Sequence, residues 1–353
     1  MRATSRARLV AAAAAVLAAG AVASADVAAS YPSRHGAADT THRHVVFSIS
    51  SPLVTESSSL AVSTTHPGLV YTTNDSGDEA TVYVLDATNG DLVGQASLTG
   101  VVAVDIEALA IGSDGTLVVG DIGDNHTERD SVHVYRFAQP GRGETSVRPE
   151  AVTLTYSDGP RDAESLLYDS EAGRVFIASK LLGGAKIYGS PTAVFDRSHA
   201  AMTPIGVAAP PIATDATFVR DQNFAVIRTY FNAAVYSYPA WHRVVSFDLP
   251  SQPQGESVAA PVGGKTLWIG SEGAGSKVLG VRLPALEPTS STAPTRTPTT
   301  TVTRTETTPV ESPHGPRLTV IAWLVLVTSA VLLLLVVIVG LVLHRRGRAS
   351  SSA

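Results

Sequence analysis

The sequence predicts an all-β fold, a β-propeller, in the middle of the chain. Short runs rich in β-branched and aromatic residues follow one another closely between Val45 and Pro284, and no amphipathic helical pattern separates them. The same short pattern also recurs about every 50 residues, a length typical of four-stranded propeller blades. A β-sandwich, the competing all-β fold, does not explain this repeat.

The composition excludes several classes of protein. The chain has 353 residues, of which 44% are hydrophobic and 16% charged, so it can bury a large core and is not wholly disordered. It has no cysteine, which excludes disulfides and a lipoprotein anchor. The formal net charge is −5, and six arginines lie close to the two ends, so the middle of the chain is more acidic still. An acidic surface repels phosphate backbones, and we expect no nucleic-acid partner.

The N-terminus has the pattern of a signal peptide, residues 1–25. A basic start precedes an apolar run from Leu9 to Ala23, and a small-x-small cleavage pattern ends at Ala25. An uncleaved N-terminal anchor is the alternative interpretation. We expect the polar segment that follows, residues 26–43, to be flexible.

The predicted propeller spans residues 44–287. Aligning its repeats places one residue at the equivalent position of each copy: Ser58, Glu107, Glu164, Asp215 and Glu256. The spacing favours five blades, and six would follow if residues 230–241 contain further strands. The fifth copy lacks one strand, and residues 45–49 can supply it, which would close the ring from both ends and remove an exposed sheet edge.

Polar residues are expected to gather at one mouth of the propeller's central channel. In each blade the first strand begins on the face where the second strand ends, so residues at these positions converge. Because carboxylates in one mouth repel each other unless a cation or a basic partner neutralises them, we expect a Ca²⁺ site. Its candidate ligands are Glu107, Glu164, Asp215, Glu256, Asp75, Asp121, Asp124 and Asn125. Asp105 and Asp162 flank the same mouth, and the alternative is that the loop residues only cap turns.

Two functions remain open from the residues alone. The first is a cation-binding module that recognises a cell-wall or small-molecule ligand. The second is a metal-dependent ester or phosphoester hydrolase, with Glu107 or Glu164 as general base and Lys180 or Arg228 stabilising negative charge. No nucleophile elbow, Walker loop or His-Glu-x-x-His motif occurs in the sequence.

The C-terminal part of the chain predicts a membrane anchor. Residues 288–317 are rich in Thr and Pro, which is typical of an extended stalk. Residues 318–343 contain no charge and can cross a hydrocarbon layer of about 30 Å as one transmembrane helix. Arginines follow in residues 344–353, and the positive-inside rule makes this tail cytoplasmic. We therefore expect a single-pass protein of the cell membrane with an extracellular propeller.

A family resemblance rests on three neighbouring stretches. Residues 105–109, 114–121 and 121–125 resemble exported actinobacterial propeller proteins related to the "esterase-like activity of phytase" and WD40-like families. The resemblance implies a propeller with Ca²⁺ in its channel and phosphate-ester substrates. Phytase-like enzymes hold phosphate with several basic residues, for which Lys180 and Arg228 are the obvious candidates here.

Overall fold

The computed structural model describes residues 43–75, 79–219 and 223–286. This part of the chain consists of 21 β-strands and one turn of 3-10 helix, Val194–Asp196, so the all-β prediction is confirmed. Among these residues no helix is long and apolar enough to cross a membrane. The predicted signal peptide, stalk, transmembrane helix and tail, together with residues 26–42, lie outside the described residues.

The described strands form antiparallel units of four. The first is β2 (Ser57–Val62), β3 (Leu69–Asn74), β4 (Thr81–Asp86) and β5 (Leu92–Leu98). The second is β6 (Ile106–Ile111), β7 (Thr116–Asp121), β8 (Val132–Ala138) and β10 (Glu150–Tyr156). The third is β11 (Ala163–Asp169), β12 (Arg174–Ser179), β13 (Lys186–Gly189) and β14 (His199–Ala208). The fourth is β15 (Ala213–Val219), β16 (Phe224–Thr229), β17 (Asn232–Ser237) and β18 (Arg243–Asp248).

The fifth unit combines both ends of the described chain. It contains β19 (Val258–Ala259), β20 (Thr266–Ile269), β21 (Lys277–Arg282) and, as its outer strand, β1 (Arg43–Ser48). The antiparallel pairing of β1 with β21 confirms that an N-terminal strand completes the last repeat. Two parallel pairings add to this plan: β9 (Gly143–Val147) extends the first unit beside β5, and β10 with β14 joins the second and third units.

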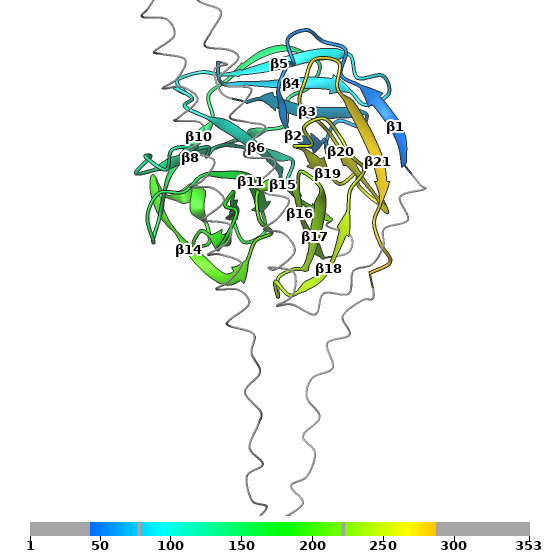
Figure 1. Cartoon of the computed structure of the whole chain (residues 1–353). Helices are drawn as coiled ribbons and strands as arrows, with labels where there is room; N and C mark the ends of the chain where they lie inside the picture. The colour runs from blue at the N-terminus through cyan, green and yellow to red at the C-terminus, as the bar shows by residue number, and fades with distance from the viewer. Residues whose placement is uncertain (1–42, 76–78, 220–222, 287–353) are drawn as a thin grey trace, which may run out of the picture. The chain divides into compact units, whose positions relative to one another are not determined.

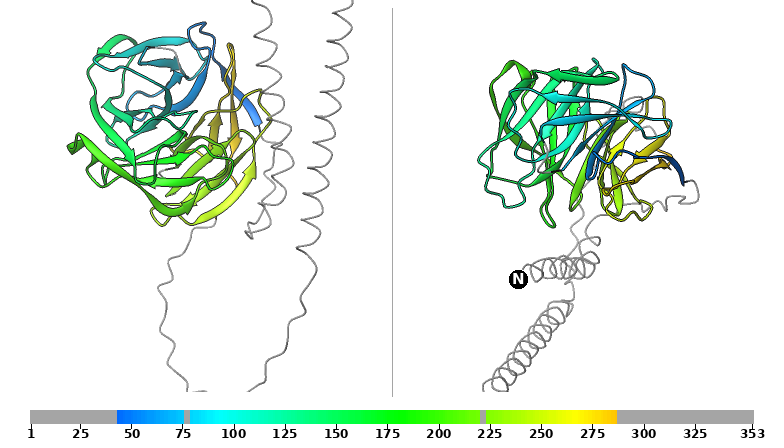
Figure 2. Two further views of the ribbon diagram at one scale, coloured as in Figure 1. Left: turned by 60° about the vertical axis from the view of Figure 1, so that its left-hand side comes forward. Right: turned by 90° about the horizontal axis from the view of Figure 1, so that it is seen from above.

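The first strands of the units form a closed ring. β2 contacts β6, β6 contacts β11, β11 contacts β15, β15 contacts β19, and β19 returns to β2. Figure 1 shows these strands at the centre of the domain, and Figure 2 shows the sheets arranged around them. Sheets that radiate from a central channel in this way are the blades of a β-propeller.

The hydrophobic core lies between neighbouring units. Each of the apolar clusters draws side chains from two adjacent units, and the last joins the fifth unit to the first. In β11, for example, Leu166 packs toward the second unit and Leu167 toward the fourth. The inner strands are buried on both faces, so apolar residues occupy successive positions along them. This explains why polar residues do not alternate with apolar ones in these strands.

Ring closure also requires a close backbone approach at Gly90. This residue has a φ of 82°, and a Cβ atom built on it would lie 2.0 Å from the carbonyl oxygen of Ser48 at the end of β1. Only glycine fits such a contact in the left-handed region of φ.

The buried side of β1 should matter more for stability than its exposed side. Phe47 packs edge-on against Trp268, with ring centroids 5.9 Å apart. We expect Phe47→Ala to lower the free energy of unfolding by about 3–5 kcal/mol, because truncation of a buried Phe leaves a cavity. Val45→Ala, at an exposed position of the same strand, should change it by less than about 0.5 kcal/mol. Urea denaturation measures both, and equal losses would contradict the role of β1 in closing the core.

Candidate functional site at the acidic mouth

A bulge at the start of the first strand defines equivalent positions in the units. The pairing register with the second strand shifts between Ser57 and Ser59, Ile106 and Ala108, Ala163 and Ser165, and Ala213 and Asp215. The residues at the shifts are Ser58, Glu107, Glu164 and Thr214. In the fourth unit the equivalent residue is therefore Thr214, and the sequence alignment that placed Asp215 there is displaced by one residue.

A repeated contact between units supports this register. The Ser58 hydroxyl donates to the carbonyl of Glu107 at 3.0 Å, and the Thr214 hydroxyl donates to the carbonyl of Glu256 at 2.8 Å. Thr214 thus corresponds to Ser58, and Glu256 to Glu107. Because side chains alternate along a strand, a displacement of one residue turns Asp215 to a different side of β15.

Asp215 is a wholly buried acid whose oxygens are already occupied. Its Oδ1 accepts hydrogen bonds from the Ser59 hydroxyl at 3.1 Å and the Ala216 N–H at 2.8 Å. Its Oδ2 accepts from the N–H groups of Val258 at 2.7 Å and Leu60 at 3.4 Å. Burial raises the pKa of Asp215, and these donors oppose that shift. The contacts tie three units together and favour a structural role over metal coordination.

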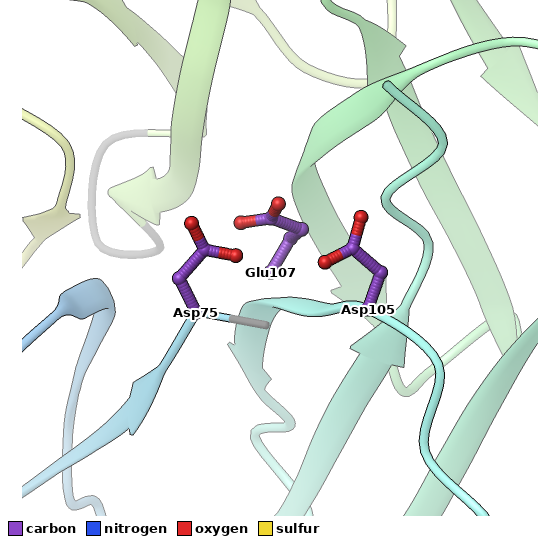
Figure 3. A group of neighbouring side chains, drawn as sticks. All are labelled: Asp75, Asp105 and Glu107. Carbon is purple, nitrogen blue, oxygen red and sulfur yellow. The ribbon is translucent and has the colours of Figure 1, made fainter. Parts of the chain in front are cut away.

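The other acids converge at one end of the channel. We call this group the acidic mouth: Asp75, Asp105, Glu107, Asp162, Glu164, Glu256 and Glu272. Three of them lie closest together, because carboxylate oxygens of Asp75, Asp105 and Glu107 are within 4.8 Å of one another. Figure 3 shows these carboxylates turned toward one another, from the end of β3 and the start of β6. The predicted convergence therefore includes Asp75, Glu107, Glu164 and Glu256.

Several oxygens of the acidic mouth are buried without a hydrogen-bond donor. Glu107 accepts from the Ser58 hydroxyl at 2.8 Å through Oε2, while its Oε1 has no partner. The same holds for Asp105 Oδ1, Glu164 Oε2 and Glu256 Oε2. A buried carboxylate oxygen without a donor is costly, so a proton or a cation must compensate it.

Burial and like charges raise the pKa of these groups. The pKa of Asp105 rises to about 6 and that of Glu272 to about 7, in both cases first through burial and then through neighbouring carboxylates. The pKa of Glu107 rises to about 10, through burial and then through Glu164 and Asp75. Without a cation, the acidic mouth therefore holds protons at neutral pH.

Lys180 is the basic residue inside the acidic mouth. Its Nζ forms an ion pair with Glu164 Oε1 and lies 5.4 Å from the ring centroid of Tyr230. Glu164 is thus partly neutralised by a neighbour from the end of the next strand. Lys180 also acts on Glu256 through its charge, and Arg129 acts in the same way on Asp105.

Arg228 has a structural role, and its guanidinium is not open to a ligand in the acidic mouth. Its guanidinium is wholly buried and donates to the carbonyls of Ser257 at 2.7 Å and Gly270 at 3.0 Å, and to Gln252 Oε1 at 3.2 Å. Burial lowers the pKa of Arg228 to about 10. These bonds join the fourth unit to the fifth, so the geometry does not favour the predicted role of Arg228 in stabilising a reacting group.

The run 121–125 builds a loop that supports the mouth. Asp121 forms an ion pair with Arg129 at 2.9 Å and accepts the N–H of Asp105 at 2.9 Å. Asp124 accepts the N–H groups of Glu128 at 2.9 Å and Arg129 at 3.0 Å.

Asn125, at the end of this run, is exposed. For Asp121 and Asp124 the turn-capping alternative agrees better with the contacts than metal ligation does. Arg129 was not predicted, and its only signal in the sequence is a positive charge a few residues after Asp121 and Asp124.

A separate cavity lies at the other end of the inner strands. Its volume is about 320 Å³, and Leu60, Leu109, Leu166 and Phe218 are among its mostly apolar lining residues. No residue of the acidic mouth lines it.

Comparisons with known proteins found similar solved structures. No protein-family model matches the chain, and no curated protein matches it in sequence. Among solved structures, the chain is similar to a glutaminyl cyclase of Myxococcus xanthus, with 12% identity over 69% of this chain and 97% of that one and a TM-score of 0.44. It is also similar to the PQQ-bound aldose sugar dehydrogenase of Streptomyces coelicolor, with 12% identity over 68% and 97% and a TM-score of 0.41.

A third similar structure is the Dos1 propeller, with 15% identity over 62% of this chain and a TM-score of 0.36. The chain matches 53% of that structure's length. None of these similarities carries an activity or ligand over to this chain. The ring of four-stranded units agrees with the resemblance to phytase-like and WD40-like families at the level of the propeller, and the specific families stay a prediction.

The two kinds of buried acid should respond differently to neutralisation. We expect Asp215→Asn to lower the free energy of unfolding by about 2–4 kcal/mol, because the amide would face N–H donors that now have a carboxylate acceptor. Glu107→Gln should leave the metal-free protein as stable or make it more stable, because the neutral amide replaces a carboxyl group that burial and like charges already penalise when it is ionised. Chemical denaturation in EDTA measures both variants, and a large loss for Glu107→Gln would contradict the assignment.

The raised pKa values predict a pH dependence with a definite sign. Between the ordinary carboxyl pKa and the folded-state values of about 6, 7 and 10 for Asp105, Glu272 and Glu107, the folded protein binds more protons than the unfolded chain. The free energy of unfolding of the metal-free protein should therefore fall as the pH rises from about 5 to about 8. Thermal unfolding in EDTA checks this, with Glu107→Gln expected to reduce the slope. A stability that rises over this range in the wild type would contradict it.

Proposed function

We propose that the protein is a five-bladed propeller whose acidic mouth binds a divalent cation, Ca²⁺, and that it serves as a ligand- or partner-recognition module. The observation that carries this proposal is the set of buried, donorless carboxylate oxygens on Asp105, Glu107, Glu164 and Glu256. Each of the five four-stranded units corresponds to one blade in this interpretation.

The donor set supports Ca²⁺ in particular. The acidic mouth offers oxygen ligands, which hard cations prefer, whereas Zn²⁺ sites usually include Cys or His. Ca²⁺ binds oxygen at 2.3–2.6 Å, so two ligand oxygens on one ion lie at most about 5 Å apart. The oxygens of Asp75, Asp105 and Glu107 are within 4.8 Å of one another and meet this limit.

The contacts favour recognition over hydrolysis. A hydrolase needs a group free to stabilise developing negative charge, and both basic candidates have other partners: Lys180 pairs with Glu164, and Arg228 donates to backbone carbonyls. No contact among the described residues supports a nucleophile or a base in an attacking position.

The proposal includes a cellular location that rests on the sequence alone. The signal peptide, stalk and transmembrane helix predicted for residues 1–25, 288–317 and 318–343 would hold the propeller outside the cell on a single-pass anchor. A cell-wall component or a small molecule would then be the ligand.

Melting the full-length protein with Ca²⁺ and with EDTA tests the cation. We expect Ca²⁺ to raise the free energy of unfolding by about 2.7 kcal/mol at a free concentration of about 100 Kd. Glu107→Gln should reduce this gain, because it removes a charged ligand. Glu171→Gln, at an exposed position away from the mouth, is the matched control and should keep the full gain. Coincident melting curves with Ca²⁺ and EDTA would refute the cation site.

A further inference from the structure

Exposed apolar side chains surround the acidic mouth. Within residues 43–75, 79–219 and 223–286, seven large hydrophobic side chains are exposed, and five of them belong to loops at the mouth. We call these five the apolar rim: Leu53, Val102, Val104, Leu182 and Phe231. They are 54% to 86% exposed. The other two, Val45 on the outer strand β1 and Val262 in the β19–β20 loop at the opposite end, lie away from the mouth.

Chain connectivity places the apolar rim next to the charged residues. Val104 directly precedes Asp105, and Phe231 directly follows Tyr230. Leu182 lies two residues after Lys180 in the β12–β13 loop.

Leu53 reaches the mouth through a hydrogen bond. Its carbonyl accepts the side-chain N–H of Asn74 at 2.8 Å, and Asn74 directly precedes Asp75. Rim residues therefore stand beside the acidic mouth on four separate loops.

Hydrogen bonds hold the backbone of the rim in place. The N–H of Val104 donates to Asp121 Oδ2 at 3.3 Å. The N–H of Phe231 donates to the Thr229 hydroxyl at 3.3 Å, and its carbonyl accepts the N–H of Leu249 at 2.8 Å. The apolar side chains are thus presented to solvent by a supported backbone, and apolar surface gathered on one face with a polar centre is typical of an interaction site.

We propose that the apolar rim and the acidic mouth together dock a protein or peptide segment in which a Lys or Arg side chain lies between apolar residues. Charge complementarity supports this occupant, since the mouth gathers seven acidic side chains around one lysine. Asp75 and Glu272 are partly exposed, and they offer a basic side chain carboxylate oxygens within the acidic mouth. The inference rests on the recognition role proposed above, and it does not depend on the cation.

Other occupants fit the charge less well. The surface of an anionic membrane would be repelled by the acidic mouth. A second copy of the chain docked through the same face would bring two acidic mouths together, which like-charge repulsion opposes. Both alternatives become outcomes of the experiment.

Peptide selection against the full-length protein tests the proposal. Three displayed libraries of seven-residue peptides carry Arg, Gln or Glu at the centre and random residues elsewhere. We expect enrichment from the Arg library alone, with Leu, Val or Phe beside the central residue. The selected peptides should bind the Leu182→Ser, Phe231→Ser double variant about tenfold more weakly or worse. No enrichment, or equal enrichment from the Gln or Glu library, would overturn the proposal.

Matched variants separate the rim from general surface effects. Val45→Ser with Val262→Ser removes two exposed valines away from the mouth and should leave peptide affinity within about twofold. An equal loss in this variant would overturn the proposal. Binding of the wild type to vesicles of phosphatidylcholine with phosphatidylglycerol, or its association with itself, is the other outcome. If Phe231→Ser abolished either of these interactions, that result would also overturn the proposal.

Measurements in Ca²⁺ and in EDTA distinguish this inference from the cation site. Peptide binding in EDTA together with coincident melting curves would refute the cation and support the docking surface. Stabilisation by Ca²⁺ without peptide binding in either condition would support the cation and refute the docking surface.

Discussion

Closure of the ring by the pairing of β1 with β21 is the constraint on which the rest of the structure depends. With both ends of the described chain in one unit, the inner strands β2, β6, β11, β15 and β19 contact one another in a closed circle. The closed circle keeps the first residues of these strands close to one another. Acids at these positions must therefore share a narrow space. The electrostatic cost of the acidic mouth is therefore a consequence of topology, since its acids lie near the starts of first strands and the ends of second strands of different units.

Two kinds of buried acid show how local register decides chemistry. Asp215 and Glu107 are both almost inaccessible to solvent, at 0% and 2% exposure, and differ by one position relative to the bulge. Asp215 meets four hydrogen-bond donors, two of which are backbone N–H groups of the first and fifth units. Glu107 meets one hydroxyl and other carboxylates, so it requires a proton or a cation. Equal burial thus produces a structural acid in one case and a candidate ligand in the other.

Much of the fold was predictable from local patterns, and much of the site was not. Apolar runs at a regular interval, with a spare strand at one end, predicted the inner strands and the closing role of β1, because burial on both faces leaves a clear signal. The register of the fourth unit was not predictable, because Thr214 and Asp215 are both polar and the alternation of side chains makes an error of one residue decisive. The partners of Arg228 were also hidden, since they are backbone carbonyls contributed by another unit.

Neither the acidic mouth nor the apolar rim adds to the stability of the folded chain. A folded chain gains nothing by leaving buried carboxylate oxygens without donors, and it gains nothing by exposing Phe231 or Val104 on a supported backbone. Departures from local consistency of this kind are concentrated at functional sites, where stability is given up for binding. Here both departures meet at one end of one channel, while the opposite end is lined by apolar side chains. A cation and a docked basic side chain would compensate the first, and the apolar part of the same partner would cover the second, so one binding event relieves both.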